Sequence, residues 1–437
     1  MKSPAGKKVL VVGMARSGRA VVDLLLRHGA EVRATDTKPV DGLPVPFGLQ
    51  SDEVFENCDW IVLSPGVPSD LEPLRKAREK GVRVIGEVEL ASGFLRGKTI
   101  GITGSNGKTT TTALVGHILR ECGIPVQVGG NIGTPVTAMI DPSRDGQWNV
   151  LELSSFQLET VSDFHAEIGV ALNVTPDHLD RHGTLERYAA AKGRLFETQR
   201  SGDFAVLNAD DATCVGYAAC TKASPLWFSL TRPVTPGVWL RDGRIWFDDD
   251  EVIPAAAVPI RGRHNLENVM AAAAAARLAG ANLEQIARAI RGFAGVEHRL
   301  EFVRRLNGVD FYNDSKATNV DATQKALDAF DGGLFVILGG KDKGSDYTVL
   351  ADSLRRKARG VLLIGAAAPT IRGQIGNRVE LTDCGTLEAA VAEAVRRAQP
   401  GNTVLLAPAC ASFDQFENYE HRGRVFKSVV ASLREVA

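Results

Sequence analysis

The sequence predicts an α/β protein of three domains, each organised around a mainly parallel sheet. Short apolar segments typical of strands alternate with helical segments along almost the whole chain. The 437 residues exceed what a single hydrophobic core usually organises. Many strand candidates also end in glycine-containing loops, where open α/β sheets bind their ligands. We place the domains at residues 1–93, 94–294 and 295–437.

The composition favours an enzyme that acts on small molecules. Lys and Arg number 51 against 52 Asp and Glu, so no net basic charge is available to attract nucleic acid or an anionic membrane. No segment approaches the roughly 18 consecutive apolar residues of a membrane helix, so we expect no membrane insertion. The six cysteines form no CxxC pair and no zinc spacing. Reduced thiols and a cytoplasmic location are therefore expected.

The first domain begins with a strand, a helix and a second strand. The apolar run KVLVVG at residues 8–13 predicts the first strand, and residues 17–29 predict a helix that ends at Gly29. The second strand follows at residues 31–34. Further strand candidates lie at residues 60–63 and 83–85. This order predicts a Rossmann-like N-terminal domain.

The loop after the first strand, residues 13–18 (GMARSG), resembles the GxGxxG fingerprint of dinucleotide-binding domains. Its middle position is Ala15, which weakens that interpretation because the missing glycine normally lets a pyrophosphate approach the backbone. Asp36, just after the second strand, is able to accept hydrogen bonds from a ribose or a base. A plain turn with Asp36 as a loop cap explains the same residues equally well. A nucleotide-containing substrate fits this loop better than NAD.

The central domain contains a run of strands followed by helices. Asp242-Gly243 lies between β-prone arms at residues 238–248 and predicts a hairpin. Asn282, with Gln285 three residues later, is typical of a helix N-cap. Strand candidates lie at residues 99–102, 149–153, 168–174 and 204–207, helices at 264–278 and 283–293, and a linker (GFAGV) at 292–296.

The C-terminal domain repeats the alternation of strands and helices, which predicts a second Rossmann-like sheet. Each strand ends in a loop rich in Gly, Ala, Pro or Lys, as expected where parallel strands present a ligand site. The strand candidates lie at residues 334–338, 361–364 and 403–406.

The segment TGSNGKTTT, residues 103–111, indicates a phosphate-binding loop in the central domain. Its spacing differs from the common P-loop, which would place a glycine at Ile102. The two glycines of the segment still permit a tight turn that points backbone N–H groups inward. Lys108 would lie on the β- and γ-phosphates, and the Thr109 hydroxyl is a potential Mg²⁺ ligand. The alternative, a glycine-rich helix start with a surface lysine, is less favoured. The central domain is therefore predicted to be a P-loop-type ATPase.

Two further residues near strand ends are candidates for metal chemistry. Glu152 lies between leucines on a strand that is predicted to be buried, where an uncompensated carboxylate is costly. A metal or a cation would offset that cost, whereas an edge-strand glutamate facing water is the alternative. His178 follows the next strand and is a candidate second metal ligand or substrate contact, although a lone histidine is more often a packing residue.

The chain resembles the Mur ligases, which build the peptide of peptidoglycan with ATP. The resemblance covers all three domains. The motifs that carry it are GSNGKTT, Gly130-Asn131-Ile132-Gly133, ELSSFQLE, NVTPDHLDRH, AAAKGR around Lys192, HNLEN, EHR, NDSKATN at 313–319 and PACASFDQFENYEHRG at 408–423. The last two are similar to the members that add D-glutamate to UDP-N-acetylmuramoyl-L-alanine. The Asn-Pro-Arg motif of the diaminopimelate-adding members is absent from this sequence.

The resemblance implies that ATP activates the carboxylate of UDP-N-acetylmuramoyl-L-alanine as an acyl phosphate, which the amine of D-glutamate then attacks. It also implies two Mg²⁺ ions, a monomer, and a place in cytoplasmic peptidoglycan precursor synthesis. Cell wall biogenesis, cell shape, cell division and the cell cycle would then depend on the reaction.

The resemblance also implies a role for each matching residue. The catalytic set is Lys108, Glu152, His178 and Lys192, and the metal ligands are Thr109, Glu152, His178 and a carbamylated Lys192. ATP is expected between the central and C-terminal domains, on Gly104, Ser105, Asn106, Gly107, Lys108, Thr109, Thr110, Asn131, Asn265, Asn268, Arg299 and Asp314. The uridine substrate is expected on Ser17, Asp36, Thr37, Ser64 and Gly66. D-Glutamate is expected on Lys316, Thr318, Lys343, Ser412 and Tyr419, with Lys341 as the alternative to Lys343. Tyr419 stands where the family pattern has phenylalanine.

Two other functions are compatible with a phosphate-binding loop. A P-loop kinase or GTPase would use Lys108 to transfer phosphate to a hydroxyl or water, but it leaves the first domain and the C-terminal motifs unexplained. A nucleotide-binding regulatory module without catalysis is opposed by the joint presence of Lys108, Glu152, His178 and Lys192.

Overall fold

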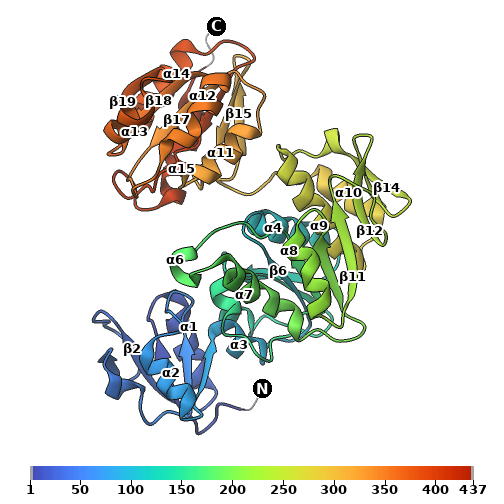
Figure 1. The fold of residues 1–437 in the computed structure, drawn as a ribbon, viewed down its shortest axis with the longest axis vertical. Coiled ribbons are helices and arrows are strands. Elements are labelled where there is room, and N and C mark those ends of the chain that lie inside the picture. The colour runs from blue at the N-terminus through green and yellow to red at the C-terminus, as the bar shows by residue number, and fades with distance from the viewer. Residues whose placement is uncertain (1–2, 435–437) are drawn as a thin grey trace. The chain divides into compact units, whose positions relative to one another are not determined.

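The computed structural model describes residues 3–434, except for the side chain of Asp180. The chain forms two compact units, one of residues up to Val258 with His264–Phe293, and one of Pro259–Arg263 with residues from Ala294 onward. The first unit contains two sheets and the second unit contains one. Figure 1 shows the three sheets, each with its own helices. The α/β class with mainly parallel sheets is thereby confirmed, whereas the boundaries at residues 93 and 294 stay a prediction.

The first sheet is five-stranded and wholly parallel, with the order β3-β2-β1-β4-β5. Apolar side chains cover both of its faces, as expected for strands buried between helices. The sequence did not indicate the three-residue strand β3, which contains a glycine and follows a proline-rich segment. The elements are β1 (Lys8–Val12), α1 (Arg16–Arg27), β2 (Glu31–Asp36), β3 (Phe47–Leu49), β4 (Trp60–Leu63), α2 (Glu72–Glu79), β5 (Arg83–Gly86) and α3 (Glu87–Ser92).

The second sheet has nine strands in the order β14-β13-β12-β11-β10-β9-β6-β8-β7. It is parallel from β7 to β12 and ends in an antiparallel meander. The predicted hairpin turn is present, with Asp242 and Gly243 both at positive φ. The strands are β6 (Lys98–Thr103), β7 (Val126–Gly130), β8 (Trp148–Glu152), β9 (Ile168–Ala171), β10 (Phe204–Asn208), β11 (Ser224–Ser229), β12 (Gly237–Arg241), β13 (Arg244–Phe247) and β14 (Asp250–Pro254).

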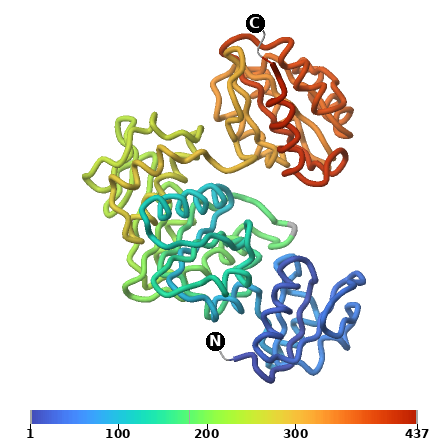
Figure 2. The backbone as a smooth tube through the Cα atoms, turned by 180° about the vertical axis from the view of Figure 1, so that it is seen from behind, coloured from blue at the N-terminus to red at the C-terminus, as the bar shows by residue number. Residues whose placement is uncertain are grey.

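The helices around this sheet bring distant parts of the chain together. The His117 ring of α4 places Nε2 3.0 Å from the carbonyl oxygen of Ala289 in α10, so these helices lie side by side (Figures 1 and 2). Asn282 and Gln285 form the capping box predicted for α10. The helices are α4 (Lys108–Glu121), α5 (Ser155–Leu158), α6 (Leu179–His182), α7 (Leu185–Glu197), α8 (Ala212–Gly216), α9 (Arg263–Leu278) and α10 (Leu283–Arg291).

The sheet of the second unit has the order β15-β16-β20-β17-β18-β19 and is parallel except for the edge hairpin β15–β16. Apolar clusters cover both faces. Its strands are β15 (Glu301–Leu306), β16 (Val309–Asn313), β17 (Leu334–Gly339), β18 (Ala358–Ile364), β19 (Leu381–Gly385) and β20 (Thr403–Leu406). Its helices are α11 (Val320–Asp328), α12 (Ala351–Lys357), α13 (Ala368–Ile375), α14 (Leu387–Arg397) and α15 (Tyr419–Ser432).

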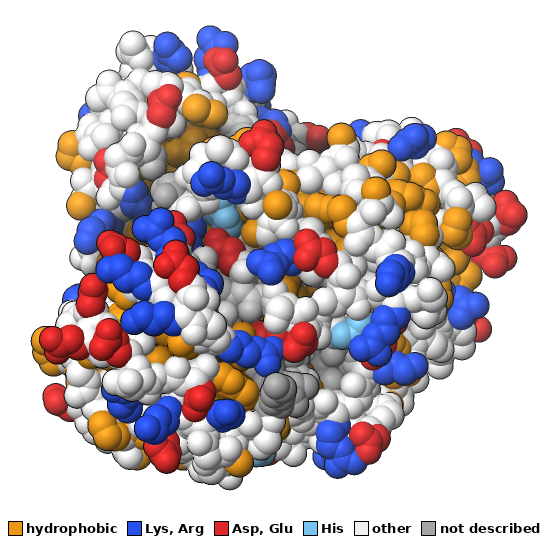
Figure 3. Space-filling model, turned by 60° about the horizontal axis from the view of Figure 1, so that its bottom comes forward, with side chains coloured by type: hydrophobic (Ala, Val, Ile, Leu, Met, Phe, Trp, Pro, Cys, Tyr) orange, Lys and Arg blue, Asp and Glu red, His pale blue; other side chains and the backbone are white. Residues whose placement is uncertain are grey.

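The surface carries mixed charges. On the face shown in Figure 3, Lys and Arg side chains are interspersed with Asp and Glu side chains. Within residues 3–434, none of the helices combines the length and the apolar character needed to cross a membrane.

Candidate functional site

The loop between β6 and α4 has the geometry of a phosphate-binding turn. Gly107 caps α4 at a φ of 86°, a left-handed conformation that disfavours other residues. A Cβ atom at Gly107 would also lie 2.2 Å from Oδ1 of Asn268. Glycine is therefore required here by both conformation and space. The N-terminus of the 14-residue helix α4 directly follows this turn, where backbone N–H groups favour an anion.

Neighbouring strand ends hold the loop in place. The Ser105 and Asn106 backbone N–H groups donate to the backbone oxygen and the side-chain oxygen of Asn173, both at 2.9 Å. The Ser105 hydroxyl donates to the Thr175 carbonyl oxygen at 3.0 Å, and the Tyr188 hydroxyl donates to Ser105 Oγ at 3.1 Å. The loop is thus pre-organised before any ligand binds. Asn173 belongs to a motif that the sequence analysis singled out, whereas Tyr188 has no such signal beyond its place one helical turn before Lys192.

Two lysines meet at the carbonyl oxygen of Gly104. Lys108 Nζ donates to this oxygen at 2.7 Å and to the Ser105 carbonyl at 3.0 Å, while Lys192 Nζ donates to it at 2.9 Å. Lys192 is buried, and its Nζ lies 4.4 Å from the centroid of the Tyr188 ring. Burial, followed by the charge of Lys108, lowers the pKa of Lys192 well below its usual value. Lys192 is therefore chemically distinct from a solvated surface lysine.

Glu152 ends β8 as a buried carboxylate that is only partly satisfied. Its Oε1 accepts a hydrogen bond of 3.0 Å from Asn131 Nδ2. Its Oε2 is buried and has no hydrogen-bond partner among the described residues. A buried carboxylate oxygen without a donor is costly, and a cation is able to supply the missing interaction. Carboxylate and hydroxyl oxygens are the hard ligands that Mg²⁺ prefers, so Glu152 and Thr109, which lies in the first turn of α4, stay candidate ligands.

His178 is more open than the other predicted catalytic residues. Its backbone is left-handed, its side chain is half exposed, and its ring packs 4.8 Å from the Phe156 ring. No cluster of three or more His, Cys, Asp or Glu side chains able to hold a metal is present within the part of the chain that the structure describes. The structure therefore brings Lys108 and Lys192 to the loop, while the metal role of His178 stays a prediction.

The asparagines expected against adenosine lie in different surroundings. The amide of Asn268 donates to Asn265 Oδ1 at 2.9 Å and accepts from the Thr111 hydroxyl at 3.3 Å, directly beneath Gly107. Asn131 bonds Glu152 and also lines a cavity of the same unit. Their contacts to ATP stay predictions.

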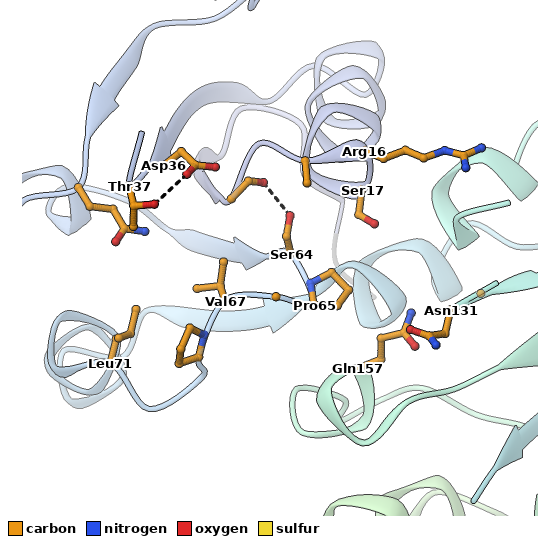
Figure 4. Close-up of a pocket in the computed structure, with 16 residues that line it drawn as sticks. Arg16, Ser17, Asp36, Thr37, Ser64, Pro65, Val67, Leu71, Asn131 and Gln157 are labelled. Carbon is orange, nitrogen blue, oxygen red and sulfur yellow. Dashed lines mark hydrogen bonds between the residues drawn. The ribbon is translucent and has the colours of Figure 1, made fainter. Parts of the chain in front are cut away.

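A cavity of about 690 Å³ opens beside the first sheet (Figure 4). All five residues expected to bind the uridine substrate line it: Ser17, Asp36, Thr37, Ser64 and Gly66. In Figure 4, Asp36 and Thr37 lie at one side, and Asn131 and Gln157 at the other. The cavity thus reaches from the first sheet to the strand ends of the second. Its walls also include residues that the sequence analysis did not assign: Arg16, Gln50, Pro65, Val67, Leu71 and Gln157.

Asp36 is an ionised acceptor at the edge of this cavity. Its Oδ2 accepts from the Met14 backbone N–H at 2.7 Å, and this bond is the main cause that lowers the pKa of Asp36. Its Oδ1 accepts from the Thr37 hydroxyl at 3.3 Å. Ser64, opposite, donates to the Gly13 carbonyl oxygen at 2.7 Å. This end of the cavity therefore offers acceptor groups suited to the N–H and O–H groups of a nucleoside.

In the second unit, Asp314 follows β16 as a buried carboxyl group. Burial raises the pKa of Asp314 to about 6, although the charge of Arg299 and the hydrogen bond from the Leu300 N–H act in the opposite direction. Arg299 Nε is buried and has no partner among residues 3–434. Arg299 therefore presents a donor with unused hydrogen-bonding capacity.

A pH-dependent stability follows from Asp314. Its carboxyl group has a pKa of about 6 in the native state, compared with an ordinary value of 3.8 that applies to the unfolded chain. Between these two pH values the native state therefore binds more protons than the unfolded state. We expect the stabilisation from the protonated group to be present at low pH and to decline as the pH rises from about 4 to about 6. Urea unfolding at several pH values should show this decline in the wild type relative to D314N. A difference that is constant with pH would contradict it.

The segments expected to bind D-glutamate converge in the second unit. Ser315 Oγ donates to the Tyr419 carbonyl oxygen at 2.8 Å, and Lys316 Nζ lies 5.7 Å from the Tyr419 ring centroid. Ser412 is buried next to Ala411, whose carbonyl oxygen accepts from the Lys341 N–H at 2.8 Å.

Lys343 belongs to an exposed turn beyond Lys341. The Asp342 carboxylate orders this turn by accepting from the backbone N–H of Lys343 at 2.8 Å and from the Tyr347 hydroxyl at 2.7 Å. Only the backbone of Lys341 pairs directly with the segment that contains Ser412. The choice between the two lysines as a substrate contact stays open.

Comparison with known proteins identifies the domains of the chain. Three family models match consecutive parts of the chain: the Mur ligase MurD-like N-terminal domain over residues 7–86, the Mur ligase middle domain over 102–276, and the Mur ligase glutamate ligase domain over 298–410.

Several relatives align with nearly the whole chain. The UDP-N-acetylmuramoylalanine–D-glutamate ligase of Solibacter usitatus is 63% identical over 434 residues, which are 98% of each chain. The proteins of the same name from Koribacter versatilis and Acidobacterium capsulatum are 51% and 50% identical, with at least 98% of each chain covered.

Solved structures share the fold at lower identity. The MurF ligase of Thermotoga maritima in complex with ADP has a TM-score of 0.62 at 18% identity, covering 98% of this chain and 96% of that one. A UDP-N-acetylmuramate–alanine ligase from the same organism has a TM-score of 0.60 at 19% identity, covering 98% and 99%.

Proposed function

Because the chain belongs to the Mur ligase family, we propose that it is an ATP-dependent ligase that joins D-glutamate to UDP-N-acetylmuramoyl-L-alanine. The observation that carries the proposal is the 63% identity to a ligase of that name over 98% of both chains. This similarity includes all three sheets, and therefore the uridine, ATP and amino-acid segments together.

The reaction has two steps. The γ-phosphoryl group of ATP is transferred to the substrate carboxylate, which gives an acyl phosphate and ADP. The D-glutamate amine then attacks the acyl carbon, the amide bond forms, and inorganic phosphate and a proton are released. Phosphorylation is needed because a carboxylate oxygen is otherwise a poor leaving group.

The phosphate loop supplies positioning and charge neutralisation for the first step. The N–H groups at the start of α4 and the Lys108 ammonium bind the β- and γ-phosphates. The hydrogen bond that Asn173 accepts from the loop and the one that Tyr188 donates to it keep the loop fixed, so little reorganisation accompanies phosphate binding. Loop rigidity and positive charge together support phosphoryl transfer.

Glu152 and Thr109 fit a Mg²⁺ ion. The buried Oε2 of Glu152, which has no partner among the described residues, needs a cation, and Thr109 in the first turn of α4 has a hydroxyl oxygen as the second candidate ligand. When bound, Mg²⁺ neutralises part of the charge on the β- and γ-phosphates. An unmodified Lys192 does not suit a second cation, because an ammonium group repels it. A carbamate on Lys192 reverses that charge, and with His178 it would form the second ion site.

The cavity beside the first sheet is the uridine substrate site. Asp36 and Thr37 bind the nucleoside end, where Asp36 is held ionised by backbone N–H groups. The opposite wall, with Asn131 and Gln157, receives the end that carries the carboxylate, because Asn131 also bonds Glu152. D-Glutamate binds in the second unit on the loops with Lys316 and Ser412. The enzyme acts as a monomer in the cytoplasm.

One assay tests the proposal against a kinase, a GTPase and a protein without catalysis. We expect release of inorganic phosphate from ATP only when UDP-N-acetylmuramoyl-L-alanine and D-glutamate are both present. Phosphate release without the amino acid would indicate hydrolysis or another transfer. No release with the complete mixture would indicate a binding protein.

A further inference from the structure

Arg422 of α15 is a fully buried arginine, with 0% of its surface exposed. Its guanidinium group donates to four oxygens of two segments. Nε donates to Ser315 Oγ at 3.0 Å, and Nη2 donates to the Ser315 carbonyl at 2.9 Å. Nη2 also donates to the Cys410 carbonyl at 3.1 Å, and Nη1 donates to the Ala411 carbonyl at 3.4 Å. The planar fork of an arginine matches acceptors spread in this way, whereas lysine has a single nitrogen.

The positive charge of Arg422 is not neutralised by a direct ion pair. Within residues 3–434, no carboxylate lies within 4.0 Å of its guanidinium nitrogens. Burial lowers the pKa of Arg422 to about 10, so the group is still charged at neutral pH. A buried charge satisfied only by neutral oxygens is costly for stability. The Asp414 carboxylate acts on this charge only beyond direct contact and offsets part of it, so the remainder is a positive potential at the nearby surface.

The four oxygens belong to the loops expected to bind the amino acid. Ser315 precedes Lys316, and its hydroxyl also donates to the Tyr419 carbonyl at 2.8 Å. Ala411 precedes Ser412, and its carbonyl also accepts from the Lys341 N–H at 2.8 Å.

The glycine loop after β17 also packs against this group. A Cβ atom on Gly340, at a φ of 137°, would lie 2.3 Å from the Ala411 carbonyl oxygen and 3.1 Å from Arg422 Nη1. Three loops that carry candidate amino-acid contacts thus meet around one guanidinium group, next to the start of α15.

We propose that Arg422 is a positioning residue that fixes these three loops in their substrate-binding conformation and makes the site select an acidic amino acid. The inference rests on the proposed function. Its first part follows from the hydrogen bonds, which tie together segments far apart in the sequence. Its second part follows from the buried charge, because an amino acid with a side-chain carboxylate is attracted by a potential that a neutral one does not feel.

The test uses R422K and R422M in the full-length protein, with the exposed R424M in the same helix as the matched control. We expect R422M to raise KM for D-glutamate about 10- to 100-fold, while KM for ATP and for the uridine substrate changes less than about threefold. R422K keeps the positive charge but loses the several donors of the guanidinium group. It should therefore retain more of the preference for D-glutamate over D-glutamine than R422M does. R424M should match the wild type.

Chemical rescue separates this role from simple packing. In R422A, added guanidinium at millimolar concentration should lower KM for D-glutamate, because it restores the missing donors in the same place. Unchanged KM for D-glutamate in R422M would overturn the inference. An equal loss for all three substrates without guanidinium rescue would also overturn it, since that result indicates a purely structural role. A different result would contradict the proposed function itself: a wild-type protein whose release of phosphate does not depend on D-glutamate.

Discussion

Replacement of Lys108 by alanine is expected to lower kcat by on the order of 1,000-fold. The Lys108 ammonium lies on the phosphate loop, where it donates to Gly104 and Ser105 carbonyl oxygens. During phosphoryl transfer, negative charge shifts over the γ-phosphate and the bridging oxygen, and a pre-positioned cation stabilises that charge without reorganisation. Alanine leaves the helix N-terminus in place but removes the cation. The measurement is phosphate release at saturating concentrations of all three substrates.

The same variant tests whether the uridine substrate binds beside the first sheet of the first unit while phosphate transfer takes place at the second. The cavity beside the first sheet does not include Lys108. We therefore expect K108A to bind the uridine substrate within about threefold of the wild-type Kd, as measured by calorimetry. The exposed lysine of the same unit, in K222A, is the control and should retain activity. Equal losses of uridine binding and turnover in K108A would show that the substrate does not occupy the cavity.

The sequence predicted correctly those turns and helix caps that depend on only a few consecutive residues. The turn at Asp242-Gly243 and the capping box of Asn282 and Gln285 are present because each depends on a few consecutive residues. Gly107 was expected in a tight loop, and its positive φ agrees with that expectation. The hairpin between β15 and β16 has a similar signal, Asn307-Gly308 at positive φ, which the sequence analysis passed over.

The remaining features depend on long-range contacts. Arg422 lies 107 residues from Ser315 along the chain, so no local pattern indicates that its charge is buried there. The contact of Asn131 with adenosine stays a prediction, whereas its hydrogen bond to Glu152 and its place in the cavity wall depend on how the strands pack. Short strands such as β3 form because a neighbouring strand supplies hydrogen bonds, and their own residues have weak propensity.

Burial changes the expected protonation state and reactivity of Lys192. In the sequence it lies in an alanine-rich helix and has the pattern of a solvated surface lysine. In the structure it is 1% exposed, and both burial and the Lys108 charge favour the neutral amine. A neutral amine is the form that adds to carbon dioxide and loses a proton to give a carbamate. The environment of Lys192 therefore supports the modification that the family resemblance implies.

We expect wild-type protein in ¹³C-labelled bicarbonate to show a carbamate carbon signal, and K192A to lack it. The signal should weaken as the pH falls, because protonation of the amine removes the reactive form. K192A should also lose on the order of 100-fold or more in kcat, since it removes the side chain that we propose as a carbamylated ligand of the second Mg²⁺ ion. K222A is again the control and should keep both the signal and the activity. A carbamate signal that persists in K192A would assign the modification to another lysine, and its absence from the active wild type would mean that Lys192 acts as the unmodified amine.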